Sequence, residues 1–520
     1  MEKVKPGTRE GCVSIGDAAF PKPFYQGLEF NSPAHGTWNI VHIGMLIPEA
    51  REIFVCADGC MRGVVLTAAE MNTEDRFSFV LLDEEDMTMS DIDDVTIEGV
   101  SRCLDRLKEA GKMPPAVLLF TVCVHHYLGA NLDHIYGELE KRYPDIRFVR
   151  CFMDCILQKA KPAPDIKLRA AMYDLIEPVK QDSALISLIG SELPLYKTCD
   201  IYKIIEIVSG SPVANILSRK VNPVLKNLPE SYFKAIDELE EQMHAGAGGR
   251  DGSHSRDNLQ DNARETANAI TFKEMAALST YEEFFDIGKS AIFMAIQPAA
   301  KMALERLGGR LGRAAFYMPA AFDMDIIERQ WHELADLIDE KCMESAWKNN
   351  GEHSKLHELM EREIESLRAD CSRALKHALK TVGNTEIRID SSFHPRPLEL
   401  AALLLTHGFK VTGIYTETFN PEEEAAYASL RKEFPELNIY SIVHPEGRVS
   451  HGNAQGALAI GQKAAWFTGT RHFVNGVYGI GLFGFDGIIR LCGLMEEAFK
   501  TEKDAEDIIV RKAWGCASCV

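Results

Sequence analysis

The chain has 520 residues and a formal net charge of −20, and 46% of its residues are hydrophobic. This length predicts about two to four domains, and the hydrophobic share excludes a wholly disordered chain. The negative charge disfavours nonspecific binding to nucleic acid or to an anionic membrane surface.

The N-terminal residues 1–7 lack the apolar core of a signal peptide. No apolar run approaches the roughly 18 residues that a membrane helix requires. We therefore expect a cytoplasmic protein that does not enter a membrane. Thirteen cysteines in a chain of this kind are not expected to form disulfides. They are either buried thiols, which are common, or metal ligands.

The first third of the chain alternates apolar strand-like runs with helical patterns. Strands are expected at residues 52–57, 77–82, 116–122 and 146–151, and helices at residues 97–110 and 128–143. This alternation predicts a parallel sheet that is built by right-handed crossovers. We place a first α/β domain at residues 1–182.

A second α/β domain is expected at residues 183–330. Its strands are predicted at residues 184–190 and 291–295, and its helices at residues 199–208 and 299–307. A polar, glycine-rich stretch near residues 244–265 interrupts this pattern and indicates a surface loop or insertion.

The rest of the chain contains a helical segment and a third α/β domain. Residues 323–382 are helical and charged, with a break at Asn349-Asn350-Gly351, and we assign residues 331–385 to a helical connector. The third domain is placed at residues 386–500, followed by a tail at 501–520. Its predicted strands are 386–389, 410–415, 437–442 and 464–467, and its predicted helices are 397–407 and 488–499. The expected fold class is α/β, with three doubly wound, Rossmann-like parallel-sheet domains.

Three cysteines, Cys12, Cys60 and Cys123, stand in recognisable phrases. The first two each follow a glycine, Gly11 and Gly59, and the last two follow apolar runs of the strand type. Residues just past strand ends line the ligand crevice of an open α/β sheet, and thiolates from separate loops can hold an iron–sulfur cluster. From spacing alone, three buried core thiols are the preferred interpretation.

Several other cysteines are weaker metal-ligand candidates. Cys56 lies within a strand and is expected to point into the core. Cys151 and Cys155 could face the same crevice as Cys123 and bind a second metal centre or contact substrate, although burial is favoured. The terminal pair Cys516 and Cys519 is half of a metal knuckle, a redox pair or simply a frayed tail.

Three further residues are weak candidates for catalysis. Cys199 begins a predicted helix, and a helix N-terminus stabilises a thiolate, so this residue could contact substrate or cofactor. His125 and His126 follow Cys123 and could shuttle protons beside a cluster. For each histidine alone, a structural role is preferred.

These phrases resemble the component-1 family of nitrogenase-like oxidoreductases, which includes the nitrogenase catalytic subunits and the dark-operative protochlorophyllide reductases. In that family the first cluster cysteine follows a glycine near the N-terminus, the second ends a Gly-Cys phrase after a strand, and the third sits at a strand end. Cys12, Cys60 and Cys123 stand in the same order and context. Residues 93–99 and 389–411 also resemble family segments, so the likeness covers most of the chain.

The resemblance implies an iron–sulfur cluster, either 4Fe–4S or a larger bridged cluster, on Cys12, Cys60 and Cys123. Gly11 and Gly59 would let the backbone approach it closely. The fourth ligand would be an Asp, a cysteine of a partner chain, or Cys56. The implied function is a catalytic-component subunit that relays low-potential electrons to a substrate or a second metallocofactor held between the domains. The implied partners are a separate ATP-dependent iron–sulfur reductase protein and a homologous subunit or a second copy of the chain.

The chain also departs from the family pattern. The family's Asp-Asp pair is Ala130-Asn131 in this sequence. The nitrogenase cofactor is held by a second-domain Cys and a third-domain His, but segment 292–298 contains no Cys and Phe483 stands at the position of the His. Dinitrogen reduction is therefore not expected. A metallocluster assembly scaffold and a non-catalytic subunit with structural thiols remain alternatives.

Overall fold

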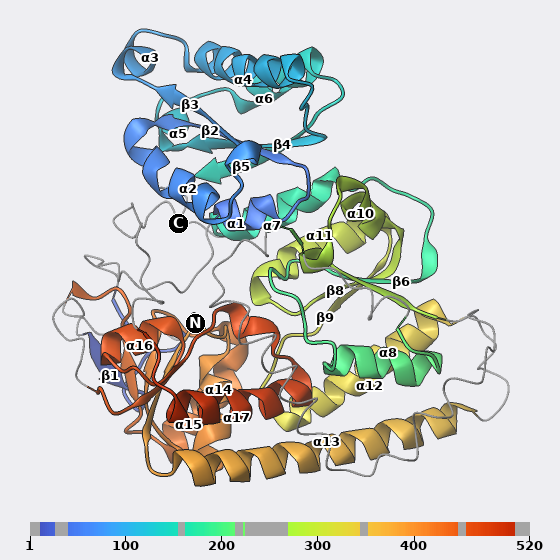
Figure 1. Ribbon diagram of the computed structural model, residues 1–520, viewed down its shortest axis with the longest axis vertical. Coiled ribbons are helices and arrows are strands. Elements are labelled where there is room, and N and C mark those ends of the chain that lie inside the picture. Colours follow the sequence, from blue (N-terminus) through green and yellow to red (C-terminus); the bar gives the residue numbers. More distant parts are fainter. Residues whose placement is uncertain are drawn as a thin grey trace, which may run out of the picture.

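The computed structural model describes residues 11–25, 40–153, 162–213, 222–223, 269–343, 352–445 and 454–504. In these residues the chain builds three β-sheets, each flanked by helices (Figure 1). The first sheet lies at the top of the view, the second below it to the right, and the third at the lower left. This is the mixed α/β, parallel-sheet fold that the sequence predicts.

The first sheet has the strand order β3-β2-β4-β5, and all its neighbours are parallel. Its strands are β2 (Arg51–Ala57), β3 (Phe77–Leu82), β4 (Ala116–Val122) and β5 (Arg147–Met153). Strand β4 is buried along its whole length because helices cover both faces of the sheet, so it is a continuous apolar run rather than an alternating one.

Helices of the first unit divide between the two faces of the first sheet. Helices α4 (Ile92–Glu109) and α6 (Leu132–Arg142) pack with one set of strand residues, including Ile53 and Val117. Helices α1 (Ile40–Met45) and α2 (Asp58–Glu70) lie on the other face, where Phe54 and Leu118 are buried. Two short helices, α3 (Glu84–Thr88) and α5 (Cys123–Tyr127), directly follow strands or their turns.

The second sheet has the order β7-β6-β8-β9 and is also parallel. Its strands are β6 (Asp182–Leu188), β7 (Thr271–Glu274), β8 (Ser290–Ala295) and β9 (Ala314–Tyr317). Its helices are α7 (Pro164–Met172), α8 (Asp200–Ser209), α10 (Tyr281–Phe285) and α11 (Lys301–Leu311). Helix α7 also packs against β5, so it links the first and second sheets.

The third sheet has the order β1-β12-β11-β10-β13-β14. Its strands are β1 (Cys12–Ser14), β10 (Glu386–Asp390), β11 (Lys410–Tyr415), β12 (Asn438–Tyr440), β13 (Leu458–Ile460) and β14 (Phe473–Val474). Helices α14 (Pro397–Thr406), α15 (Glu424–Glu433), α16 (Gln462–Thr468) and α17 (Gly484–Lys500) surround it. All pairs are parallel except β1 with β12, which is antiparallel.

Two helices join the second sheet to the third. They are α12 (Met324–Cys342) and α13 (Glu352–Val382), close to the two helices expected on either side of Asn349-Asn350-Gly351. Asp323 caps α12 by accepting hydrogen bonds from two backbone N–H groups of its first turn. Helix α13 runs along the base of the molecule and packs against α17 (Figure 1).

The structure contains strands β7, β9, β13 and β14, which the sequence did not predict, and it differs from the prediction in two further respects. Residues 464–467 are not a strand but part of helix α16, because the strand is the preceding Leu458–Ile460 run and Gly461, at φ 111°, turns the chain out of it. Residues 12–14 join the third sheet and not the first, since β1 pairs with β12 more than 400 residues away. A local pattern carries no information about a pairing of that range.

Other parts of the prediction lie outside the described residues. The first is the polar stretch near residues 244–265, which precedes the described segment 269–343. The second is the tail from residue 505 onward. Among the described residues, no helix is both long and apolar enough to cross a membrane.

Candidate metal centre at the edge of the first sheet

Cys60 and Cys123 flank the point where the strand order of the first sheet reverses. Strand β2 has β3 on one side and β4 on the other, so the chain winds in opposite directions from β2. Open α/β sheets bind ligands at such a switch point, outside the carboxyl ends of the strands. Cys60 lies in the first turn of α2, directly after β2, and Cys123 is the first residue of α5, directly after β4. The structure therefore places both thiols at the same edge of one sheet.

Accessibility separates these cysteines from most others in the described part of the chain. Cys12, Cys60 and Cys123 are partly exposed, together with Cys103 of α4. The six remaining described cysteines are buried: Cys56, Cys151, Cys199, Cys342, Cys371 and Cys492. Because a metal ligand has to be reached by the metal and to be a thiolate, partial exposure favours the first set over the second.

Cys12 lies on a different sheet from Cys60 and Cys123. Its strand, β1, belongs to the third sheet, and its thiol donates to Asn438 Oδ1 at 3.9 Å. Among the described residues, only Glu328, His332 and Glu361 form a set of three or more Cys, His, Asp or Glu ligand atoms within 4.8 Å of one another. The three thiols are thus not gathered to that distance in this structure, and their joint role stays a prediction.

The two glycines have different surroundings. A Cβ added to Gly59 would meet no atom within 4 Å, so space is open beside Cys60. A Cβ added to Gly11 would lie 2.9 Å from Nδ1 of His444, so Gly11 is needed for packing against that imidazole. Close approach of a ligand to the backbone is therefore compatible with Gly59, whereas Gly11 already has a structural reason to be glycine.

Two of the weaker metal-ligand candidates, Cys56 and Cys151, are core thiols. Cys56 is buried in β2, donates to the Met61 sulfur at 2.8 Å, and burial raises its pKa to about 12. Cys151 is buried in β5, and burial raises its pKa well above the usual value. Cys155, Cys516 and Cys519 lie outside the described residues.

Cys199 occupies the N-cap position of α8, as the sequence suggests, but it is completely buried. Burial, followed by the neighbouring Asp200 carboxylate, raises the pKa of its thiol. The stabilisation that a helix N-terminus gives a thiolate is therefore outweighed in this case. In this structure Cys199 has the surroundings of a structural thiol.

His125 and His126 differ in their surroundings. His125 is buried, its Nδ1 accepts from the Val122 N–H at 3.2 Å, and its Nε2 lies 3.0 Å from Thr96 Oγ1. Burial lowers its pKa to about 4, so it is neutral at physiological pH and fixes the start of α5. His126 is exposed beside Tyr127, so of the two histidines it is the one that solvent reaches.

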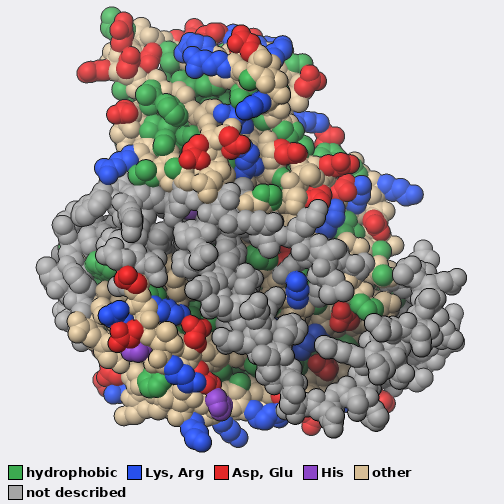
Figure 2. Space-filling view, viewed as in Figure 1, with side chains coloured by type: hydrophobic (Ala, Val, Ile, Leu, Met, Phe, Trp, Pro, Cys, Tyr) green, Lys and Arg blue, Asp and Glu red, His purple; other side chains and the backbone are tan. Residues whose placement is uncertain are grey.

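Hydrophobic side chains are exposed at two places on the first unit. Tyr127 and Leu128, at the end of α5, are 75% and 46% exposed, and Phe79 and Leu81 of edge strand β3 are 48% and 46% exposed. Figure 2 shows hydrophobic side chains gathered on the first unit where Figure 1 draws β3 and α5. An exposed apolar group of this kind, beside partly exposed thiols, is typical of a surface that another molecule covers.

The second and third sheets meet where the resemblance would place a further cofactor. Gln297, which follows β8, donates from Nε2 to the Tyr478 carbonyl at 3.2 Å. Phe483, at the position of the family's histidine, is 2% exposed. Segment 292–298 contains no Cys, and a phenylalanine is not a metal ligand, so neither of the two ligands that the resemblance predicts for a second cofactor is present at these positions.

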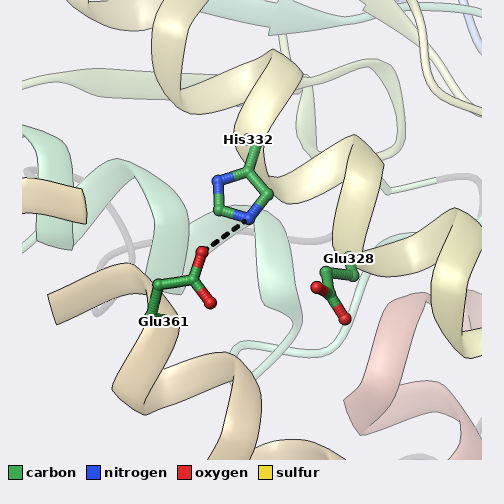
Figure 3. A group of neighbouring side chains, drawn as sticks. All are labelled: Glu328, His332 and Glu361. Atoms are coloured by element: carbon green, nitrogen blue, oxygen red, sulfur yellow. Dashed lines mark ion pairs between the residues drawn. The ribbon is translucent and has the colours of Figure 1, made fainter. Parts of the chain in front are cut away.

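One possible metal-binding group was missed by the sequence reading. Glu328 and His332 of α12 lie beside Glu361 of α13 (Figure 3). The available signal was Glu-x-x-x-His in one helix and His357-x-x-x-Glu in the next, since residues four apart share one face of a helix. Their pairing depends on the register of the two helices, which the sequence does not reveal.

No protein-family model and no curated protein matches this chain. Among solved structures, it is similar to one titled "Nitrogenase Cp1 at pH 6.5", with a TM-score of 0.54 and 10% identity over 91% of this chain and 94% of that one. A second, "Nitrogenase Cp1 at pH 5", gives a TM-score of 0.49 and 10% identity over 94% and 93% of the two chains. At this identity the first likeness establishes a nitrogenase-like fold across nearly the whole chain.

Proposed function

We propose that this chain is the catalytic-component subunit of a nitrogenase-like, ATP-dependent reductase system. It would relay low-potential electrons through an iron–sulfur cluster to a substrate or cofactor held between the domains. One observation carries the proposal: in a chain with a nitrogenase-like fold, the partly exposed Cys60 and Cys123 flank the switch point of the first sheet.

The three cysteine thiols have the chemistry of iron–sulfur ligands, and two of them also have a suitable position. Cys60 and Cys123 begin helices after neighbouring parallel strands, so their thiols lie at one edge and can be reached from one side. Cys12 would add a third thiolate from the third sheet. A cluster that takes all three would therefore connect the first and third sheets, and it needs a fourth ligand from elsewhere. When bound, the cluster supplies one-electron storage and transfer.

The protein's own residues would position and shield such a cluster. The buried His125 fixes the first turn of α5 and hence the backbone at Cys123. The open space at Gly59 leaves room beside Cys60. Tyr127 and Leu128 would exclude water from the cluster once a partner covers them.

The proposed partners are a homologous subunit or a second copy of this chain, and a separate ATP-hydrolysing iron–sulfur reductase. The exposed Phe79, Leu81, Tyr127 and Leu128 support a protein partner at the first unit. Because segment 292–298 contains no Cys and Phe483 stands at the position of the family's histidine, we do not propose dinitrogen as the substrate.

The test is iron and acid-labile sulfide content of protein that is purified without oxygen. We expect about four irons per chain or per interface in the wild type, with loss of most iron in Cys60→Ala and in Cys123→Ala. The matched control is Cys103→Ala, which removes another partly exposed thiol of the first unit and should keep the iron. Iron-free wild type, or iron that survives both substitutions, would contradict the cluster and favour a non-catalytic subunit with structural thiols.

A metallocluster assembly scaffold is the second candidate. The lack of a Cys in segment 292–298 and of a His at position 483 favours it, because a protein without fixed ligands at the junction could release its cargo. Turnover with a reductase, ATP and a candidate substrate would support the enzyme. Transfer of a cluster to an apo partner without turnover would support the scaffold.

A further inference from the structure

Helices α12 and α13 carry a mixed imidazole–carboxylate group that the proposed electron relay does not use. Three ion pairs set the register between the two helices: Asp325 with Arg368, Glu328 with Arg368, and His332 with Glu361. As the residue number rises along α12 it falls along α13, so the helices pack antiparallel. Side chains four residues apart on each helix therefore face the same point.

The ligand atoms of Glu328, His332 and Glu361 all lie within 4.8 Å of one another. Nε2 of His332 and Oε1 of Glu361 are 3.4 Å apart. Two ligands that each sit about 2.1 Å from a tetrahedral zinc ion are separated by about 3.4 Å. This pair thus has the spacing of a tetrahedral site, and Figure 3 shows the Glu328 carboxylate turned toward the same space.

Neighbouring groups orient one of these ligands. Arg368 donates from Nη1 to Oε2 of Glu328 at 2.6 Å, and from Nη2 to Asp325 at 2.7 Å. One oxygen of Glu328 is therefore held by Arg368, while its other oxygen can accept a different partner. An outer hydrogen bond that fixes a ligating carboxylate is the usual support of a metal ligand, and the Asp325 carboxylate offsets the charge of Arg368.

A second imidazole lies next to the group. The rings of His332 and His357 have centroids 6.0 Å apart and are inclined by 21°. His357 is one turn before Glu361 on α13, so it lines the same side of that helix. The side chains are accessible from solvent, since those of His332, Glu328 and Glu361 are 27%, 38% and 61% exposed.

We propose that Glu328, His332 and Glu361 bind a divalent transition-metal ion of the zinc type across α12 and α13. Imidazole with carboxylate oxygen suits zinc and its spectroscopic substitute cobalt, and three protein ligands leave one coordination position for water or for His357. The ion would tie the helix that follows the second sheet to the helix that leads into the third. The inference is independent of the thiol cluster, which uses other residues.

The test is titration of the purified full chain with Co²⁺ alone, followed by competition with Zn²⁺. We expect visible d–d bands that show nitrogen and oxygen ligands, and any near-ultraviolet charge-transfer band of a cobalt thiolate would report the separate cysteines proposed above as cluster ligands. Because the loss of an outer partner already weakens metal binding by about 10- to 100-fold, the His332→Ala/Glu361→Gln double variant should bind about 100-fold more weakly. Zn²⁺ should raise the melting temperature of the wild type and leave that of the double variant unchanged.

The matched control is His377→Ala. His377 also lies on α13 and pairs with one carboxylate, Glu496, at 2.6 Å, so it offers the same chemistry without the third ligand. It should bind cobalt as the wild type does. An absence of nitrogen–oxygen d–d bands in the wild type, a cobalt affinity of this site that is unchanged in the double variant, or equal loss in His377→Ala would overturn the proposal. Equal melting temperatures of all variants in chelator would show that any loss of binding does not come from misfolding.

Discussion

Two regions of this molecule use the same local device, a polar or thiol residue at a helix start, in opposite ways. At the edge of the first sheet, Cys60 and Cys123 begin α2 and α5 and stay partly exposed. At the junction of α8, α12 and α17, Cys199 and Asp200 begin α8 and are completely buried. The thiols at the edge of the first sheet stay accessible at the surface. At the junction, by contrast, the side chains of Cys199 and Asp200 are buried by packing.

The junction and the first sheet also differ in how their buried carboxylates are hydrogen-bonded. Asp200 accepts from Trp331 Nε1 at 2.7 Å, Phe485 N–H at 2.8 Å and Asp486 N–H at 3.0 Å. In the first sheet, Glu52 is 1% exposed, and neither of its carboxylate oxygens has a hydrogen-bond partner among the described residues. The junction is thus built to hold the second and third sheets in one position. The accessible Cys60 and Cys123 thiols lie in the first unit, which is where we place the proposed function.

The largest effect is expected at the junction. Asp200→Ala leaves an indole N–H and two backbone N–H groups buried without an acceptor, so the free energy of unfolding should fall by about 3–5 kcal/mol. Urea denaturation measures this. Asp336→Ala, an exposed position on α12, should change it by no more than about 0.5 kcal/mol. A loss below about 1 kcal/mol at Asp200 would mean that the junction is not a rigid lock.

A pH-dependent effect is expected from Glu423, whose Oε1 accepts the N–H groups of Leu398 and Glu399 at the start of α14. Burial, more than these bonds can offset, raises its pKa to about 8. The folded state thus holds this proton more tightly than the unfolded chain, and ionisation favours unfolding. The contribution of Glu423 to the free energy of unfolding should fall as pH rises from about 4.5 to about 8, by no more than a few kcal/mol.

The measurement is the difference in the free energy of unfolding between the wild type and Glu423→Gln across that pH range. Other titrating groups cancel in this difference. It should shift in favour of the variant as pH rises and level off above about pH 8. A difference that does not change with pH would show that Glu423 is ionised throughout.

Much of the fold could be predicted because buried parallel strands are continuous apolar runs, and each run is flanked by residues that favour turns. Strands β3, β4 and β11 have the bounds expected from the sequence. The strand predicted at residues 464–467 was wrong because a short apolar run does not distinguish a strand from a buried helix. The antiparallel β1–β12 pair could not be predicted, since it depends on contacts between distant segments.

The candidate site was less predictable than the fold. Both Cys123 and Cys199 are at helix starts after apolar segments, and their neighbours in the sequence do not reveal that Cys199 is covered by the junction. Burial is decided by tertiary packing. The same holds for His332 and Glu361, which meet only through the register of α12 and α13.

A substitution of Glu52 should change the free energy of unfolding less than Asp200→Ala does, and in the opposite direction. Burial raises the pKa of Glu52 well above its usual value, and α1 lies directly on this side chain because Gly44 has no side chain. Glu52→Met keeps the length and removes two buried oxygens without partners, so it should raise the free energy of unfolding by about 1–3 kcal/mol. Glu52→Gln, which keeps polar atoms there, should give no such gain. Destabilisation by Glu52→Met would instead indicate an ionised carboxylate that interacts with Arg76.

The smallest effects on stability are expected at the proposed ligands, and they sharpen the comparison most directly. A serine at Cys60 or Cys123 stays partly exposed, so each substitution should change the free energy of unfolding of the iron-free chain by no more than about 0.5 kcal/mol. Cys199→Ser places a hydroxyl in a completely buried site and should cost about 1–3 kcal/mol. Urea denaturation of the three variants tests this order. If Cys60→Ser and Cys123→Ser destabilised the iron-free chain as much as Cys199→Ser does, their thiols would be packing residues too, and the two regions would no longer differ in how they use their cysteines.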